Sequence, residues 1–422
     1  MQLSPAAATE YRRMWSELAD VGREPATGGY RRYAWTNADA TLREWFAAEA
    51  SRRGLDVTTD RNGNLWAWWG DPTRRDDGVV TGSHLDSVPD GGAYDGPLGV
   101  VSAYAAVDAL RASGHVPDRP LAVALFGDEE GARFGVACAG SRLLTGALDP
   151  DRARGLTDLD GVRLGEAMRA AGHDPAQLGR DDETLRRIGT FIELHVEQGR
   201  GLVGLGAPVG VASGIWPHGR WRLDLLGEAN HAGTTRLADR EDPMLRLAAA
   251  VTAARSSAER RDALATIGRL IVEPNGTNAV PSVVRAWLDA RGPEDGAVRQ
   301  VVADVGAAAG VEAVEESWSP RVDFDAALRD GLAVLLDNAP VLGTGAGHDA
   351  GVLASAGVPT AMLFVRNPTG VSHSPAEYAE EADCLVGVAA LARVLALTTG
   401  GSGADLSGAG EDTVSTVLHT GS

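Results

Sequence analysis

The chain has 422 residues, of which 44% are hydrophobic and 23% are charged. This length exceeds what a single compact core usually holds, so we expect two domains. The formal net charge of -19 at pH 7 repels phosphate backbones and anionic lipids, which excludes nucleic acid and membrane surfaces as expected partners and favours chemistry on a small molecule.

The N-terminal segment, residues 1–14, has no apolar core between a basic stretch and a small-residue cleavage site. No window of the sequence reaches the roughly 18 uninterrupted apolar residues that a membrane span requires. Cys138 and Cys384 lie far apart, as expected for two buried thiols in a reducing compartment. These features predict a cytoplasmic protein.

Apolar runs of strand length alternate with helical patterns along the first half of the chain. Residues 79–83 and 121–126 predict strands, and residues 98–112 between them predict a helix. Two more apolar runs, 190–194 and 358–365, complete the set. The alternation predicts an α/β domain with a largely parallel sheet flanked by helices. In such sheets ligands gather beyond the carboxyl ends of the strands.

The pattern changes at about residue 212. Residues 221–226 and 283–291 alternate apolar and polar side chains, with helical patterns between them, which predicts an inserted antiparallel α+β domain of ferredoxin-like type over residues 212–330. The first domain is then discontinuous, and it comprises residues 1–211 and 331–398.

The last residues, 399–422, are mainly Gly, Ser, Ala and Thr. Such a composition buries too little apolar surface to offset the entropy lost on ordering. We therefore expect a disordered tail that includes His419.

Candidate metal ligands follow the first predicted strand. His84 and Asp86 lie on the same face, so Asp86 can hold the ring nitrogen opposite a metal ion and fix the tautomer. The alternative for His84 is a core or helix-capping histidine. Asp95 stands in a glycine-rich loop, residues 91–97, which can present one carboxylate to two ions. Taken alone, Asp95 is equally well a turn aspartate.

The adjacent residues Glu129 and Glu130 follow the strand at 121–126. In a metal-dependent hydrolase one such carboxylate binds metal, while the other stays free to take a proton from water. The alternative is a solvated acidic turn that also contains Asp128. The position between an apolar strand and Gly131 favours the functional interpretation.

Two histidines complete the candidate set. His195 follows the strand at 190–194, and His373 lies in the motif Ser372-His-Ser-Pro-Ala-Glu. This motif also predicts a capping box and a helix that starts at Ser374, which is compatible with metal ligation by His373. Histidine and carboxylate ligands predict a centre of two divalent ions. Three other histidines lie in polar stretches and are expected on the surface: His115, His173 and His218.

With these motifs the chain resembles the M20 metallopeptidase family, and within it the amidase branch that includes N-carbamoyl-L-amino-acid hydrolases, allantoate amidohydrolases and β-ureidopropionase-like enzymes. The resemblance covers about residues 11–397. Its motifs are Gly82-Ser-His-Leu-Asp-Ser-Val, Gly92-Ala-Tyr-Asp-Gly, Asp128-Glu-Glu-Gly-Ala-Arg-Phe, Glu193-Leu-His-Val-Glu-Gln-Gly, His231-Ala-Gly-Thr, Asn278-Ala-Val-Pro, Gly347-His-Asp-Ala and Ser372-His-Ser. His195 is decisive, because the peptidase branch has a carboxylate at that position.

The resemblance implies a phosphorylase/hydrolase-like fold and two divalent ions per subunit, which zinc, manganese, cobalt or nickel could supply. The ligand sets would be His84, Asp95 and His195 for one ion and Asp95, Glu130 and His373 for the other. Glu129 would be the general base, and Asp86 would support catalysis through His84.

The resemblance also implies that the inserted domain serves as a dimerisation or lid domain. His231 would stabilise the oxyanion in the opposite subunit, and Asn278 and Arg291 would bind the substrate carboxylate. The alternative for Arg291 is a surface strand arginine. Gln198 would lie near the ureido group, and His348 would lie at the wall of the site.

The implied function is a homodimeric two-metal amidohydrolase that cleaves the carbamoyl or ureido C–N bond of a small anionic substrate, with allantoate first and N-carbamoyl-L-amino acids second. A dinuclear exopeptidase would have a carboxylate in place of His195. A non-catalytic binding protein would be expected to have lost a ligand or Glu129. The segment Arg200-Gly-Leu-Val departs from the Pro-Val-Leu-Glu usual in this branch, which leaves the substrate open.

Overall fold

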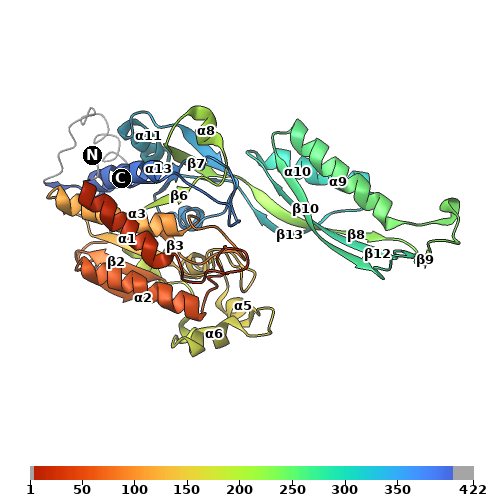
Figure 1. Cartoon of the computed structure of the whole chain (residues 1–422), viewed down its shortest axis with the longest axis horizontal. Helices are drawn as coiled ribbons and strands as arrows, with labels where there is room; N and C mark the ends of the chain where they lie inside the picture. Colours follow the sequence, from red (N-terminus) through yellow and green to blue (C-terminus); the bar gives the residue numbers. More distant parts are fainter. Residues whose placement is uncertain (1–3, 403–422) are drawn as a thin grey trace. The chain divides into compact units, whose positions relative to one another are not determined.

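The computed structural model of the chain describes residues 4–402 (Figure 1). The described residues form two compact units: one contains residues 4–213, 323–342 and 347–402, and the other contains residues 214–322 and 343–346. The chain thus re-enters the first unit at Asp323, earlier than the predicted residue 331. At this point the backbone N–H of Phe324 donates to the carbonyl of Ser213.

The first unit is built on a nine-stranded mixed sheet in the order β1-β2-β5-β3-β6-β16-β7-β14, with β15 paired to β7. Its four central strands run parallel. These strands are β5 (Leu121–Phe126), β3 (Gly78–His84), β6 (Ile188–Val196) and β16 (Thr360–Val365). The others are β1 (Asp56–Thr59), β2 (Leu65–Trp69), β7 (Val209–Ile215), β14 (Val322–Asp323) and β15 (Val341–Thr344). The predicted α/β fold with a largely parallel sheet is confirmed.

The central strands are apolar along their whole length because helices cover the sheet. Every residue of β3, β5 and β16 is buried, which is the pattern of parallel strands packed on both faces. Helix α3 (Pro97–Ala112) lies against β3 and β6, and nearly all of its residues are buried. Helix α13 (Glu381–Thr399) packs on α3 and on β16. The core therefore lies between this pair of helices and the sheet.

Further helices lie around the sheet and its loops. These are α1 (Pro5–Leu18), α2 (Asn37–Arg52), α4 (Ala139–Thr145), α5 (Pro150–Gly155), α6 (Leu164–Ala170), η1 (Pro175–Gln177), α7 (Asp182–Arg186), α8 (Gly201–Leu205), α11 (Ala326–Leu335) and α12 (Asp349–Ser355). Within residues 4–402, α13 is the one helix long and apolar enough to cross a membrane. In the protein 67% of its most apolar window is buried, as in a core helix.

The second unit is an antiparallel α+β unit. Its four-stranded sheet has the order β10-β12-β8-β13, and residues along β12 alternate between buried and partly exposed. The buried side chains pack with those of two helices into a separate core. The elements are β8 (His218–Leu226), β9 (Asn230–His231), η2 (Leu237–Asp239), α9 (Pro243–Arg260), β10 (Leu264–Glu273), β11 (Ala279–Val280), β12 (Val283–Arg291), α10 (Asp295–Ala309) and β13 (Val314–Ser319).

The prediction of a helix that begins at Ser374 is wrong. Residues 374–380 contain no helix, and α13 begins at Glu381. The side chain of Glu377, which a capping box would fold back onto its own segment, instead accepts hydrogen bonds from the backbone of Tyr94 and Asp95. A long-range contact thus takes the carboxylate that the local pattern assigned to a cap.

The expected surface position of His115 is also wrong. His115 is 2% exposed, and its Nε2 lies 2.9 Å from Oγ1 of Thr399 at the end of α13. The residues after it are ordered by the strand pair β4 (Val116–Pro117) and β17 (Gly401–Ser402). At the start of the predicted tail, Thr399 thus ends α13 and residues 401–402 form β17, whereas residues 403–422 with His419 lie outside the described range.

Candidate metal centre

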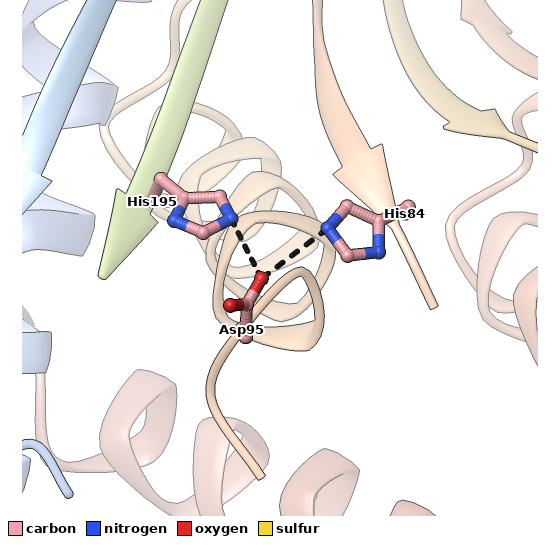
Figure 2. Close-up of side chains that lie close together, drawn as sticks. All are labelled: His84, Asp95 and His195. Atoms are coloured by element: carbon pink, nitrogen blue, oxygen red, sulfur yellow. Dashed lines mark ion pairs between the residues drawn. The ribbon is translucent and has the colours of Figure 1, made fainter. Parts of the chain in front are cut away.

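Three of the predicted ligands meet beyond the carboxyl ends of adjacent parallel strands. His84 is the last residue of β3, His195 is the penultimate residue of β6, and Asp95 lies in the loop before α3. Figure 2 shows both imidazole rings directed at one oxygen of the Asp95 carboxylate. Oδ1 of Asp95 is 3.5 Å from Nε2 of His84 and 3.3 Å from Nε2 of His195. All three residues are buried.

Backbone carbonyls select the tautomer of both histidines. Nδ1 of His84 lies 3.1 Å from the carbonyl oxygen of Asp86, and Nδ1 of His195 lies 2.9 Å from that of Val196. A carbonyl only accepts, so each Nδ1 carries the proton of the neutral ring and each Nε2 presents a lone pair. Both Nε2 atoms are buried and have no hydrogen-bond partner among the described residues. Two lone pairs and a carboxylate that converge in a buried site fit a divalent cation.

A second cluster lies on the other side of the Asp95 carboxylate. Nε2 of His373 is 3.5 Å from Oδ2 of Asp95 and 3.6 Å from Oε2 of Glu130. Burial, together with the nearby charge of Asp95, raises the pKa of Glu130 to about 8. Each oxygen of Asp95 thus faces a different group of potential ligands. This arrangement suits a carboxylate shared by two ions, since the added positive charge would offset the repulsion between Asp95 and Glu130.

Glu129 is buried next to the first cluster but belongs to neither group. Its Oε2 lies 3.8 Å from Nε2 of His84, and its Oε1 accepts a hydrogen bond from the Cys138 thiol at 3.4 Å. Burial raises the pKa of the Glu129 carboxyl well above its ordinary value, and the carboxylates of Glu130 and Asp349 add to this, whereas His84 lowers it. A carboxylate with a raised pKa next to potential metal ligands can both accept and return a proton.

Asp86 holds the two acidic residues in place. Its Oδ1 accepts a hydrogen bond from the backbone N–H of Glu129 at 3.1 Å, and its Oδ2 accepts one from Glu130 at 3.0 Å. The carboxylate is also 3.5 Å from Nδ1 of His84, although the carbonyl of Asp86 is the nearer partner of that nitrogen. Asp86 therefore links the end of β3 to the loop after β5.

Gln198 and His348 line the same region. Nε2 of Gln198 donates to Oδ2 of Asp95 at 2.8 Å. His348 caps α12, and its ring centroid lies 4.5 Å from that of His195. Burial lowers the pKa of His348 well below its ordinary value, so the ring is neutral. Glu193 lies close to both histidines, but its oxygens already accept hydrogen bonds from the Ser83 hydroxyl and the Ala350 N–H.

Two neighbouring residues were not identified from the sequence as part of this region. The Glu377 carboxylate binds the backbone of the Asp95 loop, and Ser372 places its hydroxyl 3.1 Å from Oδ2 of Asp95. Both belong to the motif that supplied His373, so the signal was present. The sequence does not show that this motif contacts the loop at residues 92–96, some 280 positions earlier.

Three further predicted residues lie in the second unit. His231 is exposed at the end of β9, and its Nδ1 accepts the N–H of Gly233 at 3.0 Å. Asn278 is exposed, and its carbonyl accepts the N–H of Ala232. Arg291 ends β12. The roles of these residues towards a substrate remain predictions, as do those of the residues in the first unit.

Comparison with known proteins gives a consistent result. Residues 80–397 match the family described as peptidase family M20/M25/M40. The chain is 35% identical over 399 residues to an N-carbamoyl-L-amino acid amidohydrolase of Geobacillus stearothermophilus, which covers 90% of this chain and 96% of the relative. It is 31% identical to the allantoate amidohydrolase of Escherichia coli (strain K12), and this match covers 90% of this chain and 95% of that relative. A solved hydantoinase/carbamoylase family amidase from Burkholderia ambifaria matches with a TM-score of 0.79 and 31% identity, covering 94% and 98%.

Proposed function

The chain belongs to the M20 family and is an amidohydrolase of carbon–nitrogen bonds in linear amides other than peptides, and we propose that it acts through two divalent ions on a small ureido carboxylate. Allantoate is the first candidate substrate, and an N-carbamoyl-L-amino acid is the second. Both candidates are supported by similar relatives, since allantoate amidohydrolases and N-carbamoyl-L-amino acid amidohydrolases match over about the same length of chain.

The observation that carries the proposal of two ions is the double-sided environment of Asp95. Its Oδ1 faces His84 and His195, and its Oδ2 faces His373. We assign His84, Asp95 and His195 to one ion and Asp95, Glu130 and His373 to the other. Zinc, manganese, cobalt and nickel all accept imidazole and carboxylate ligands.

When bound, such ions polarise the substrate carbonyl and make water more acidic. Glu129 takes the proton of the attacking water and returns it to the leaving nitrogen, which fits its burial and its raised pKa. Asp86 keeps Glu129 in position through the backbone N–H that it accepts. We place Gln198 near the ureido group of the substrate and His348 at the wall of the site.

We propose that Arg291 and Asn278 bind the substrate carboxylate. A guanidinium can form two parallel hydrogen bonds to a carboxylate, which gives orientation as well as affinity. We propose that His231 stabilises the oxyanion that forms in the opposite subunit of a homodimer. Its exposure in the isolated chain supports this role, since nothing buries the ring within its own unit.

The edge of the second sheet supports a homodimer. β10 is an edge strand of ten residues, and it exposes the apolar side chains of Leu264, Leu270 and Ile271. A long, exposed apolar edge promotes association unless another chain covers it. We also propose a cytoplasmic location, which the two free, buried cysteines support. Light scattering of the purified protein would test the dimer.

The test of the function is a substrate panel on protein loaded with manganese or zinc. Allantoate, ureidoglycine, N-carbamoyl and N-formyl amino acids and a dipeptide are compared, and released ammonia and amine are both measured. We expect ammonia from a ureido or carbamoyl substrate and its loss in Glu129→Gln with the metal content retained. Dipeptide cleavage alone would favour an exopeptidase. Substrate binding without turnover would favour a non-catalytic protein.

A further inference from the structure

The loop that carries Asp95 is held by a carboxylate from the far end of the sequence. Oε1 of Glu377 accepts hydrogen bonds from the backbone N–H of Tyr94 at 2.8 Å and of Asp95 at 2.9 Å. Glu377 is 5% exposed, so these bonds are largely shielded from solvent. One buried oxygen therefore fixes two successive peptide groups, and the second of these belongs to the residue that faces both ligand clusters.

The loop is shaped to admit this contact. A Cβ atom on Gly92 would lie 2.4 Å from Cβ of Glu377, so only glycine allows the two segments to approach this closely. On the other side of the loop, a Cβ atom on Gly96 would lie 2.4 Å from the His84 ring. The loop is thus fitted between Glu377 and His84, and Asp95 has little freedom to move between them.

The same carboxylate also reaches the segment that carries His373. The Ser372 hydroxyl lies 3.2 Å from Oε2 of Glu377 and 3.1 Å from Oδ2 of Asp95. Glu377 therefore contacts the backbone of the shared aspartate on one side and the neighbour of a second-cluster histidine on the other. Among residues 4–402, Glu377 is the carboxylate from outside the loop that hydrogen-bonds both to its backbone and to Ser372.

We propose that Glu377 is a positioning residue that sets the Asp95 carboxylate between the two ligand clusters and ties the Ser372-His373 segment to it. This role rests on the two-ion function proposed above. Residues that orient metal ligands typically change metal affinity by about 10- to 100-fold when they are replaced. A carboxylate that only stabilised the fold would change the stability of the metal-free protein and leave the affinity unaltered.

The experiment compares Glu377→Ala with Glu377→Gln. Alanine leaves both N–H groups of the loop without their acceptor. Glutamine keeps an oxygen for them, and its amide can donate to Ser372. Affinity and stoichiometry for manganese and zinc are measured by chelator competition and elemental analysis, and the melting temperature is measured without metal. We expect Glu377→Ala to bind at least one ion about 10- to 100-fold more weakly and Glu377→Gln to recover most of that loss.

Asp181→Ala is the matched control for Glu377→Ala, because it too removes a buried acceptor. Asp181 is also 5% exposed, and it also accepts hydrogen bonds from a backbone N–H and a hydroxyl, both of Thr184, at the start of α7. It should lower the melting temperature without changing metal affinity. Equal metal affinity in wild type and Glu377→Ala would overturn this inference alone. A wild-type protein that binds neither ion would overturn the proposed function, and the inference with it.

Discussion

Arg291 donates two hydrogen bonds to Asp289, which lies two residues earlier on the same face of β12. The bonds run from Nε to Oδ1 at 2.7 Å and from Nη2 to Oδ2 at 3.0 Å, and Nη1 donates to the carbonyl of Gly345 at 2.9 Å. Three of the five N–H donors of the guanidinium are used in this way. The group is therefore held in one orientation, with two donors left for another acceptor.

We expect Arg291→Ala to raise KM for carboxylate substrates by about 10- to 100-fold, because a hydrogen bond to a charged group contributes roughly 1.5–3 kcal/mol. Neutral amide analogues should be affected far less. Arg285→Ala is the control, since Arg285 lies on the same strand and pairs with Glu273. Steady-state kinetics on matched acid and amide substrates provides the measurement. Equal loss on both substrates would contradict the assigned grip.

Asp95 faces both ligand clusters, so replacing it should lower the metal content more than replacing a residue of one cluster. Asp95→Asn leaves one carbonyl oxygen where two carboxylate oxygens face two clusters, so both ions should be lost or strongly weakened. His373→Ala removes a group from one cluster only and should leave about one ion per chain. Elemental analysis after gel filtration decides between these outcomes. His115→Gln is the control, because His115 hydrogen-bonds to Thr399 instead of lying in either cluster, and it should keep the metal content of the wild type. Identical losses in both site variants would argue against a bridging role.

Cys138 should influence the proposed base without being essential. Its thiol donates to Oε1 of Glu129, and a thiol is a weak donor. We expect Cys138→Ala to lower kcat by about 2- to 5-fold with little change in KM, as for the loss of roughly 0.5–1 kcal/mol. Cys384→Ala, at a second buried thiol, serves as the comparison and should leave kcat intact. A change in KM alone would show that the thiol acts on binding instead.

Asp60 predicts a pH dependence of stability outside the candidate centre. Burial raises the pKa of this carboxyl to about 6, although hydrogen bonds from Asn64 and Asn62 oppose the shift. Since the folded state binds this proton more tightly than the unfolded state, the stabilisation is complete below the ordinary pKa and disappears as the pH rises through about 6.

Between pH 4 and pH 7 the wild type should therefore lose up to about 3 kcal/mol of unfolding free energy relative to Asp60→Asn, which cannot titrate. Urea unfolding at several pH values gives the difference in unfolding free energy between the two proteins. The contributions of the titratable groups that both proteins share cancel in this difference. Parallel curves for the two proteins would show that Asp60 does not titrate in this range.

Much of the architecture could be predicted because its strands are governed by local patterns. The runs at 121–126 and 283–291 coincide with β5 and β12, and the helix expected at 98–112 starts one residue earlier, at Pro97. Their apolar patterns match the environment that each strand occupies in its sheet. The rule that ligands lie beyond the carboxyl strand ends also placed His84 and His195 at one edge of the sheet, and the pairing of β3 with β6 makes them neighbours.

The errors occurred where a distant partner outweighed a local preference. Glu377 had the spacing of a capping residue, but the two N–H groups that it binds lie about 280 positions away. His115 lies in a polar stretch, yet the end of α13 covers it. Asp86 lies next to Nδ1 of His84, as the sequence suggested, but the sequence does not show that its carboxylate also accepts hydrogen bonds from the backbone of Glu129 and Glu130. Sequence spacing carries no information about such contacts.

The order of β3 and β6 has a consequence for biosynthesis. These adjacent strands, with the loop between β3 and α3, contain His84, Asp95 and His195, so the first cluster can form once about half of the chain has left the ribosome. The other cluster must wait for His373, after β16 has been added beside β6. With the two ions proposed above, the residues assigned to the first ion are therefore all synthesised well before the residues assigned to the second are complete.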